Sequence, residues 1–138
     1  MFKIIKTLFL LLLFLAPPLF IFTTYPIRHS EIIEKYAQKY GLEPSLVYAV
    51  INTESGFRAD ALSPKGAKGL MQIMDKTGEW GFQMMEMGGD FYPDMLYDPE
   101  INIAIGCWYL NRLILQYRDV NTALAAYNAG SGNVSKWL

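Results

Sequence analysis

Residues 44–56 read PSLVYAVINTESG, a stretch with the pattern of an amphipathic helix that ends in a glutamate. Its apolar residues recur three and four positions apart, the spacing that places side chains on one helical face. These residues are Leu46, Val47, Val50 and Ile51. Glu54 continues the same face, four residues after Val50. The stretch therefore predicts a helix that opens at Pro44, where proline is well tolerated, and directs a carboxylate toward apolar neighbours.

Glu54 is the candidate catalytic residue. A poorly hydrated site disfavours the charged form of a carboxyl and raises its pKa, so Glu54 could hold and donate a proton near neutral pH. This placement predicts function rather than stability. The alternative is a glutamate at a helix end that reaches back to solvent or to a lysine.

Further along the chain, two segments are difficult to explain as scaffolding: GAKGLMQIM at residues 66–74 and AAYNAG at residues 125–130. Between them, residues 96–110 contain a Leu-x-Asp-Pro-Glu-x-Asn-Ile stretch, then Gly106 and Tyr109-Leu110. Together with Glu54-Ser55-Gly56, these ordered blocks resemble the soluble lytic transglycosylase domain of the lysozyme-like superfamily. The resemblance runs from about residue 32 to residue 138. It implies a mainly α-helical, lysozyme-like transglycosylase domain.

The resemblance also implies a reaction, cleavage of the β-1,4 bond between N-acetylmuramic acid and N-acetylglucosamine in peptidoglycan strands. In this family the glutamate protonates the leaving oxygen, the C6 hydroxyl of the substrate attacks the anomeric carbon, and the same glutamate takes its proton. The product is a 1,6-anhydro sugar, and no water is consumed. Most glycosidases use a second carboxylate, but the nearest ones, Asp60 and Asp75, lie in or beside loops and are easily explained as solvated or capping residues.

Two other functions stay open at this point. One is a muramidase-type hydrolase of the same bond that uses water and Asp60 or Asp75. The other is a non-catalytic glycan-binding or assembly protein. Two departures from the family pattern bear on the choice: Asp75 stands where a proline is common, and the sequence stops at Leu138, where family members usually continue with a closing segment. Either the sequence is a fragment or this version of the domain is truncated.

Five further site residues follow from the resemblance as substrate contacts: Ser63, Gln72, Met74, Tyr127 and Asn128. Each has a simpler explanation. Ser63 could be a turn residue, Gln72 a solvent-facing residue of an apolar helix, and Met74 ordinary core. Tyr127 could be a half-buried core tyrosine rather than a hydrogen-bond partner of Glu54, and Asn128 could cap a helix end. Met71 is predicted as core.

Four aromatic residues could line a glycan groove or form a satellite core: Trp80, Phe82, Phe91 and Tyr92.

The N-terminus predicts a membrane segment. Lys3 and Lys6 precede an apolar run without charged side chains that ends at residue 27. This charge pattern places the rest of the chain outside the cytoplasm, and its length is near the ~20 residues that span a bilayer. Pro17 and Pro18 stand where a small-residue cleavage site would be expected. Residues 1–27 are therefore predicted as a retained anchor or an uncleaved signal, and residues 28–138 as the catalytic domain on the extracytoplasmic side of the cell membrane.

Composition argues against several other classes of protein. The 138 residues suffice for one compact domain. From Arg28 onward the chain is mildly acidic and has no basic run, so no nucleic acid partner is predicted. Cys107 is the only cysteine and lies in an apolar helical pattern, which predicts a buried thiol. His29 is the only histidine and lies far from Cys107 in sequence, so neither a metal site nor a cofactor is predicted.

The remaining helices are predicted from caps and periodicity. Ser30 can cap a helix that runs to Tyr40, and Asp98 can cap a long helix from Pro99 to Tyr117. Residues 60–68 contain glycine and proline and are predicted as a loop. The other predicted helices span residues 69–77, 80–87, 121–127 and 133–138.

Overall fold

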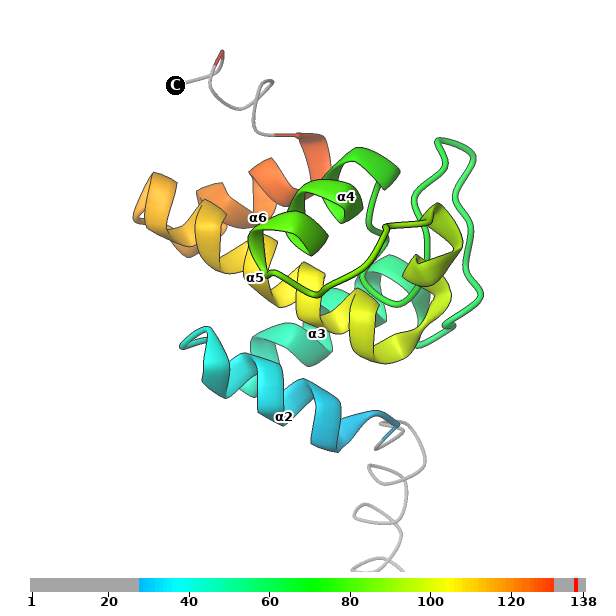
Figure 1. The fold of residues 1–138 in the computed structure, drawn as a ribbon. Coiled ribbons are helices and arrows are strands. Elements are labelled where there is room, and N and C mark those ends of the chain that lie inside the picture. The colour runs from blue at the N-terminus through cyan, green and yellow to red at the C-terminus, as the bar shows by residue number, and fades with distance from the viewer. Residues whose placement is uncertain (1–27, 131–135, 137–138) are drawn as a thin grey trace, which may run out of the picture.

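The computed structural model describes residues 28–130 and Lys136, and this part of the chain is mainly α-helical (Figure 1). Its elements are α2 (Ser30–Lys39), α3 (Pro44–Ser55), α4 (Asp75–Met84), the 3-10 helix η1 (Pro93–Tyr97), α5 (Pro99–Tyr117) and α6 (Val120–Ala129). The only β pairing among the described residues consists of isolated bridges from Lys68 to Leu62 and to Ile73. The predicted mainly α fold class is confirmed.

Helix α5 is the central element of the domain. In Figure 1 it crosses the fold with α2 on one side and α4 and α6 on the other, and all three contact it, as does η1. Nine of its residues are buried, including every residue from Asn102 to Trp108. The helix begins as predicted, because the Asp98 carboxylate accepts hydrogen bonds from the backbone N–H groups of Glu100 and Ile101.

Helix α3, the predicted carrier of Glu54, opens at Pro44 and ends at Ser55 as expected. The stripe that packs into the core consists of Val47, Val50 and Ile51, with Leu46 only partly buried at its edge. Gly56 ends the helix in the left-handed conformation at φ 59°, and its N–H donates to Asn52 O. This end directs the chain into the loop over which the candidate site lies.

Several helix boundaries differ from the predictions, among them those of the helix predicted at residues 80–87, which spans Asp75–Met84 as α4. Ser30 is inside α2, because His29 occupies the cap position in a left-handed conformation, and its side chain makes no capping bond. Helix α6 starts at Val120 rather than Asn121, with Asp119 as its N-cap, and it extends to Ala129. The predicted helix at residues 133–138 lies outside the described residues, as does the predicted membrane segment at residues 1–27. Between Arg28 and Gly130, none of the helices is both long and apolar enough to cross a bilayer.

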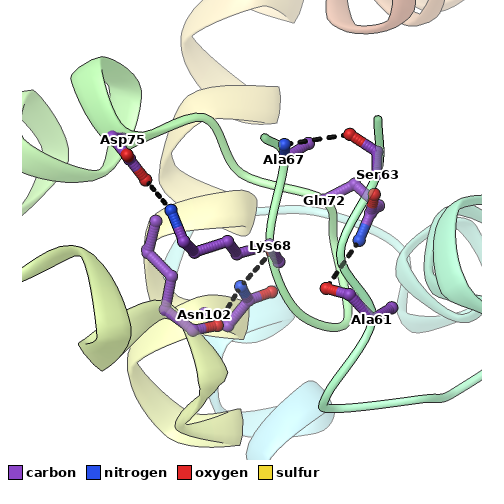
Figure 2. A network of polar contacts seen from close by, with 8 residues as sticks. Ala61, Ser63, Ala67, Lys68, Gln72, Asp75 and Asn102 are labelled. Atoms are coloured by element: carbon purple, nitrogen blue, oxygen red, sulfur yellow. Dashed lines mark hydrogen bonds and ion pairs between the residues drawn. The ribbon is translucent and has the colours of Figure 1, made fainter. Parts of the chain in front are cut away.

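The predicted helix over residues 69–77 is wrong. Residues 69–74 form a tight turn, with Gly69 at φ 74° and Gln72 at φ 49°, and α4 starts at Asp75 and runs to Met84. The turn forms because its backbone groups bond to partners distant in sequence. Asn102 of α5 donates to Lys68 O (Figure 2). It also accepts from Met71 N–H. This turn, joined to the loop at residues 60–68, positions one wall of the site.

Gly69 allows the turn to lie directly against α5. A Cβ atom at this position would collide with the Leu96 carbonyl oxygen and with the Asn102 side chain, whereas one on Gly66, in the same loop, would meet no atom within 4 Å. Both glycines have positive φ angles, 74° and 89°. Substitutions at Gly66 and Gly69 therefore separate the loss of stability caused by close packing from the loss caused by backbone conformation.

We expect Gly66→Ala to lower the free energy of unfolding by about 1–2 kcal/mol, the cost of a left-handed conformation for a residue with a Cβ. Gly69→Ala should lower it by about 1–3 kcal/mol more, because the new methyl overlaps backbone and a buried amide. Urea unfolding of both variants followed by circular dichroism measures the difference. Equal losses in the two variants would contradict the close packing of the turn on α5.

Candidate active site

Glu54 lies in the last turn of α3, beside cavities that separate it from α6 and from the loop. Its side chain is partly buried, and burial raises the pKa of its carboxyl. Desolvation is the sole cause of this shift, and the structure places no cation in an ion pair with Glu54 among the described residues. The environment therefore favours the protonated form, as a general acid requires.

Two of the cavities adjoin Glu54. The apolar cavity, of about 190 Å³, lies between α3 and α6 and is lined by Leu46, Ala49, Val50, Thr53, Glu54, Leu124, Tyr127 and Asn128. The acid cavity, of about 250 Å³, lies over the loop and is lined by Glu54, Ser63, Lys65, Ala67, Gln72, Met74, Tyr127 and Asn128. Glu54 thus has hydrocarbon on one side and polar groups on the other.

A third, outer cavity of about 290 Å³ continues from the acid cavity toward α4. Its lining consists of Lys65, Gln72, Ile73, Met74, Thr77, Tyr109, Tyr127, Asn128, Ala129 and Gly130. Tyr127 and Asn128 line all three cavities, so the cavities adjoin one another along the end of α6. The acid cavity alone brings Glu54 together with all five predicted contact residues: Ser63, Gln72, Met74, Tyr127 and Asn128.

The backbone of Leu70 and Met71 is clamped by side chains from three helices. Ser55 of α3, next to Glu54, donates its hydroxyl proton to Leu70 O at 2.8 Å. Asn102 of α5 accepts from Met71 N–H at 2.7 Å, and Tyr127 of α6 donates to Met71 O at 2.8 Å. The clamp consequently fixes the acid, the phenol and the loop relative to one another. Met71 itself is fully buried, so its predicted core role is confirmed.

Tyr127 differs from the prediction in its hydrogen bond. Its phenol proton goes to Met71 O rather than to Glu54. Because a phenol has only one proton to donate, the Tyr127 oxygen can interact with Glu54 only as an acceptor, which requires the protonated carboxyl. The pKa of Tyr127 is raised well above its usual value, by burial first and by the Glu54 charge next, so the phenol stays neutral. Its ring packs on Tyr109, with centroids 5.6 Å apart.

Gln72 and Ser63 present polar atoms to the acid cavity from the loop. Gln72 lies in the turn and not in a helix, and its amide nitrogen donates to Ala61 O at 3.3 Å (Figure 2). The same nitrogen donates to Gly69 O at 3.0 Å. Its amide oxygen is then oriented as an acceptor. Ser63 is a turn residue whose hydroxyl accepts from Ala67 N–H at 2.9 Å, which leaves its proton for another acceptor.

Glu54 is the single carboxylate among the residues that line the three cavities. Asp75, at the start of α4, forms an ion pair with Lys68 instead. Asp60 is exposed on the loop and lines none of these cavities. Met74, at the end of the turn, is 44% exposed and lines the acid and outer cavities, so it is not ordinary core.

The remaining chemical candidates lie away from the cavities. Phe82 is buried and packs on Phe91 at 5.7 Å between ring centroids, but both belong to the main core rather than to the predicted satellite core. Trp80 is 41% exposed and packs edge-on against Trp108, but like the exposed Tyr92 it lines none of the three cavities. Cys107 is fully buried as predicted, and burial raises the pKa of its thiol to about 12.

Sequence reasoning missed two residues that bear on the site. Lys65 lines the acid and outer cavities from an exposed loop position, which no periodicity reveals. Asn102 is fully buried and holds the turn at Lys68 and Met71. A signal for Asn102 was present, because it is the one polar residue in the run Ile101-Asn102-Ile103-Ala104-Ile105.

The mainly helical fold and the single carboxylate in the cavities agree with the lysozyme-like class of domain. Residues 31–138 match the family described as the Transglycosylase SLT domain, and the chain belongs to that family. It is 36% identical over 115 residues to the soluble lytic murein transglycosylase of Escherichia coli K12, and 39% identical over 116 residues to the membrane-bound lytic murein transglycosylase C of Haemophilus influenzae. These alignments cover 83% and 78% of this chain, but only 18% and 32% of the relatives.

Solved structures give the same result. The 70-kDa soluble lytic transglycosylase of E. coli matches with a TM-score of 0.75 at 36% identity, and the lytic transglycosylase Slt of Pseudomonas aeruginosa with 0.74 at 34%. Each match covers 83% of this chain and 19% of the solved one. The chain therefore corresponds to one domain of these much longer proteins.

The raised pKa of Glu54 predicts how stability changes with pH. A carboxyl whose pKa is raised on folding stays protonated to higher pH in the folded than in the unfolded state. Between the two pKa values the folded state binds more protons, so the free energy of unfolding falls as the pH rises through that interval. The side chain in Glu54→Gln does not titrate, so this variant does not lose free energy of unfolding over that interval. We expect its melting temperature to exceed that of the wild type at pH 7, with a difference that shrinks toward pH 4.

Thermal unfolding at both pH values, followed by circular dichroism, measures the difference. The matched control is Glu79→Gln, which changes an exposed glutamate of α4. A difference between Glu54→Gln and the wild type that is the same at pH 4 and pH 7 would contradict a destabilising charge on Glu54.

Proposed function

We propose that this chain is a peptidoglycan lytic transglycosylase, which cleaves the β-1,4 bond between N-acetylmuramic acid and N-acetylglucosamine and leaves 1,6-anhydro ends. The observation that carries the proposal is a single, partly desolvated carboxylate in a cavity lined by polar residues. A hydrolase that follows the usual scheme needs a second carboxylate at ~5–9.5 Å. Glu54 has no such partner along the three cavities.

In the proposed reaction Glu54 acts first as acid and then as base. The protonated carboxyl gives its proton to the glycosidic oxygen as the bond from the anomeric carbon to that oxygen breaks. The C6 hydroxyl of the same N-acetylmuramic acid then bonds to the anomeric carbon, and its proton passes to the Glu54 carboxylate. Glu54 is thereby restored as an acid. Since no water is added, no second group is needed to activate one.

The remaining residues of the acid cavity have roles in substrate binding. The Gln72 amide oxygen and the Ser63 hydroxyl proton are suited to sugar hydroxyl and acetamido groups. Met74 offers an apolar surface to the sugar ring. Asn128 adds an exposed amide where the three cavities meet. Tyr127 lines the same cavity as Glu54 and gives its phenol proton to Met71 O, so that proton does not stabilise the ionised carboxylate.

The relatives support this function. They are named as lytic murein transglycosylases, and the Pseudomonas structure is described as an inactive mutant in which glutamine replaces a glutamate. A 70-kDa soluble lytic transglycosylase has also been solved in complex with bulgecin A. This chain spans less than a third of the relatives' length, so the activity is assigned here to the domain that they share with it.

We also propose that residues 1–27 are retained as a membrane anchor and that residues 28–138 form the catalytic domain on the extracytoplasmic side. The support is the charge pattern of the first residues, where Lys3 and Lys6 precede a long run without charged side chains. Peptidoglycan lies outside the cytoplasmic membrane, so this orientation would bring the acid cavity to its substrate. Both soluble and membrane-bound enzymes occur among the relatives' names.

A digest of purified peptidoglycan by the full chain tests the function. We expect muropeptides one water lighter than the hydrated forms, resolved by mass spectrometry. Glu54→Gln should lower the rate toward the upper end of the ~10²–10⁴-fold range of general acid–base catalysis, because the same carboxyl serves both steps. Asp60→Asn is the matched control and should keep both the rate and the anhydro product.

Other products would decide between the alternatives. Hydrated muropeptides, with a rate that falls in Asp60→Asn, would establish a muramidase-type hydrolase. Glycan binding without products, equal in wild type and Glu54→Gln, would establish a non-catalytic binding or assembly protein.

Asn128 allows a test of substrate binding apart from chemistry. Its side chain is exposed, lines all three cavities and makes no hydrogen bond to the described part of the chain. We expect Asn128→Ala to raise KM for a soluble glycan fragment about 5–10-fold, the loss of one hydrogen bond of ~1 kcal/mol, with kcat and melting temperature unchanged. Asn121→Ala, exposed at the other end of α6, is the control. An unchanged KM in Asn128→Ala would remove this residue from the binding site.

A further inference from the structure

Asn102 is a buried polar residue in the middle of the apolar core. It is 0% exposed, as are the next two residues, Ile103 and Ala104. All of its side-chain hydrogen bonds leave α5. The amide nitrogen donates to Leu96 O at 2.7 Å and to Lys68 O at 2.9 Å, and the amide oxygen accepts from Met71 N–H at 2.7 Å. A buried amide with every group satisfied fixes the orientation of its partners.

The partner that matters for the site is the backbone of Met71. The peptide unit between Leu70 and Met71 is held at both ends, because its carbonyl accepts from Ser55 and its N–H donates to Asn102. The next peptide unit, between Met71 and Gln72, accepts from the Tyr127 hydroxyl. Gln72 N–H closes the turn onto Gly69 O at 3.2 Å. The direction of the Met71 carbonyl thus depends on a peptide unit that Asn102 holds.

We propose that Asn102 is a positioning residue for the acid, which acts through the Met71 backbone to hold the Tyr127 hydroxyl beside Glu54. The proposal rests on the proposed function, because it assigns Asn102 a part in setting the proton affinity of the catalytic carboxyl. Without the bond from Asn102, the Leu70–Met71 peptide unit can rotate and the Met71 carbonyl moves off the phenol. The Tyr127 proton then becomes available to Glu54, where it would stabilise the ionised carboxylate and lower its pKa.

The alternative is that Asn102 only stabilises the fold. Both roles predict a loss of stability on substitution, since each leaves buried backbone groups unsatisfied. The two roles differ in whether the effects on kcat of substituting Asn102 and Tyr127 are independent of each other. A purely structural role would lower kcat by the same factor with or without the phenol hydroxyl, whereas a role that acts through that hydroxyl disappears when it is removed.

The first test is a double-mutant cycle on kcat in the full chain, with Asn102→Ala, Tyr127→Phe and both together. We expect Asn102→Ala to lower kcat by up to ~10²-fold with little change in KM, the size of effect that a misplaced group produces. In the Tyr127→Phe background the same substitution should lower kcat by less than ~3-fold. Ile33→Val, a buried change in α2, is the control for stability alone.

The second test needs neither turnover nor a substitution of Asn102, so it applies even if Asn102→Ala does not fold. In the full chain in detergent micelles, NMR can follow the Glu54 carboxyl and the Met71 and Asn102 amide resonances during a pH titration, with Glu54→Gln used for assignment. The titratable groups that line the cavities beside Glu54 are Tyr127 and Lys65. We expect both amide resonances to follow the Glu54 titration in the wild type but not in Tyr127→Phe.

The outcomes are separable. The positioning role would be overturned if Asn102→Ala lowered kcat by the same factor with and without the Tyr127 hydroxyl. It would also be overturned if the two amide resonances did not follow the Glu54 titration, or if they followed it equally in the wild type and in Tyr127→Phe. A wild-type protein that forms no anhydro products would overturn the proposed function instead, and the NMR titration would still report whether Asn102 is coupled to Glu54.

Discussion

The clamp on the backbone of Leu70 and Met71 is the interaction on which the rest of the structure depends. Three helices each contribute one side chain to it, Ser55 from α3, Asn102 from α5 and Tyr127 from α6. Buried backbone groups must be paired, so these bonds are obligatory once the turn is enclosed by the core. The loop that lines the acid cavity consequently takes its shape from the helices. Gly69 completes this arrangement, because a larger residue would separate the turn from α5.

The proposed reaction places two requirements on a single carboxyl. As an acid, Glu54 must hold a proton near neutral pH, and the hydrocarbon of α3 and α6 on one side promotes this by excluding water. As a base, it must also be stable enough as a carboxylate to exist between the two steps, and the polar cavity on its other side makes this state accessible. A fully buried carboxyl would fail at the second step and a fully hydrated one at the first.

The sequence predicted those features that depend on local pattern. Helices α3 and α5 were located from their apolar periodicity together with Pro44 and Asp98, signals that act within a few residues. The turn at residues 69–74 was predicted as a helix because its composition is apolar, whereas its backbone partner Asn102 lies about 30 residues away. The grouping of the candidate site residues came from resemblance to a family, and no local signal gives the Tyr127 bond to Met71. Long-range hydrogen bonds are what sequence patterns do not contain.

The bond between Tyr127 and Met71 joins positions 56 residues apart in the chain, and this separation has a consequence for folding. Contacts between residues so far apart in sequence form late, because closing the loop between them costs conformational entropy. Helix α3, which carries Glu54, is synthesised before α4, α5 and α6. The cavities around Glu54 are incomplete until α6 has docked on α5. Partly folded chains would therefore present Glu54 to bulk water, with an ordinary carboxylate's proton affinity. Under the proposed function, the active site is complete only after α6 has docked on α5, so a half-folded chain would not cleave glycan.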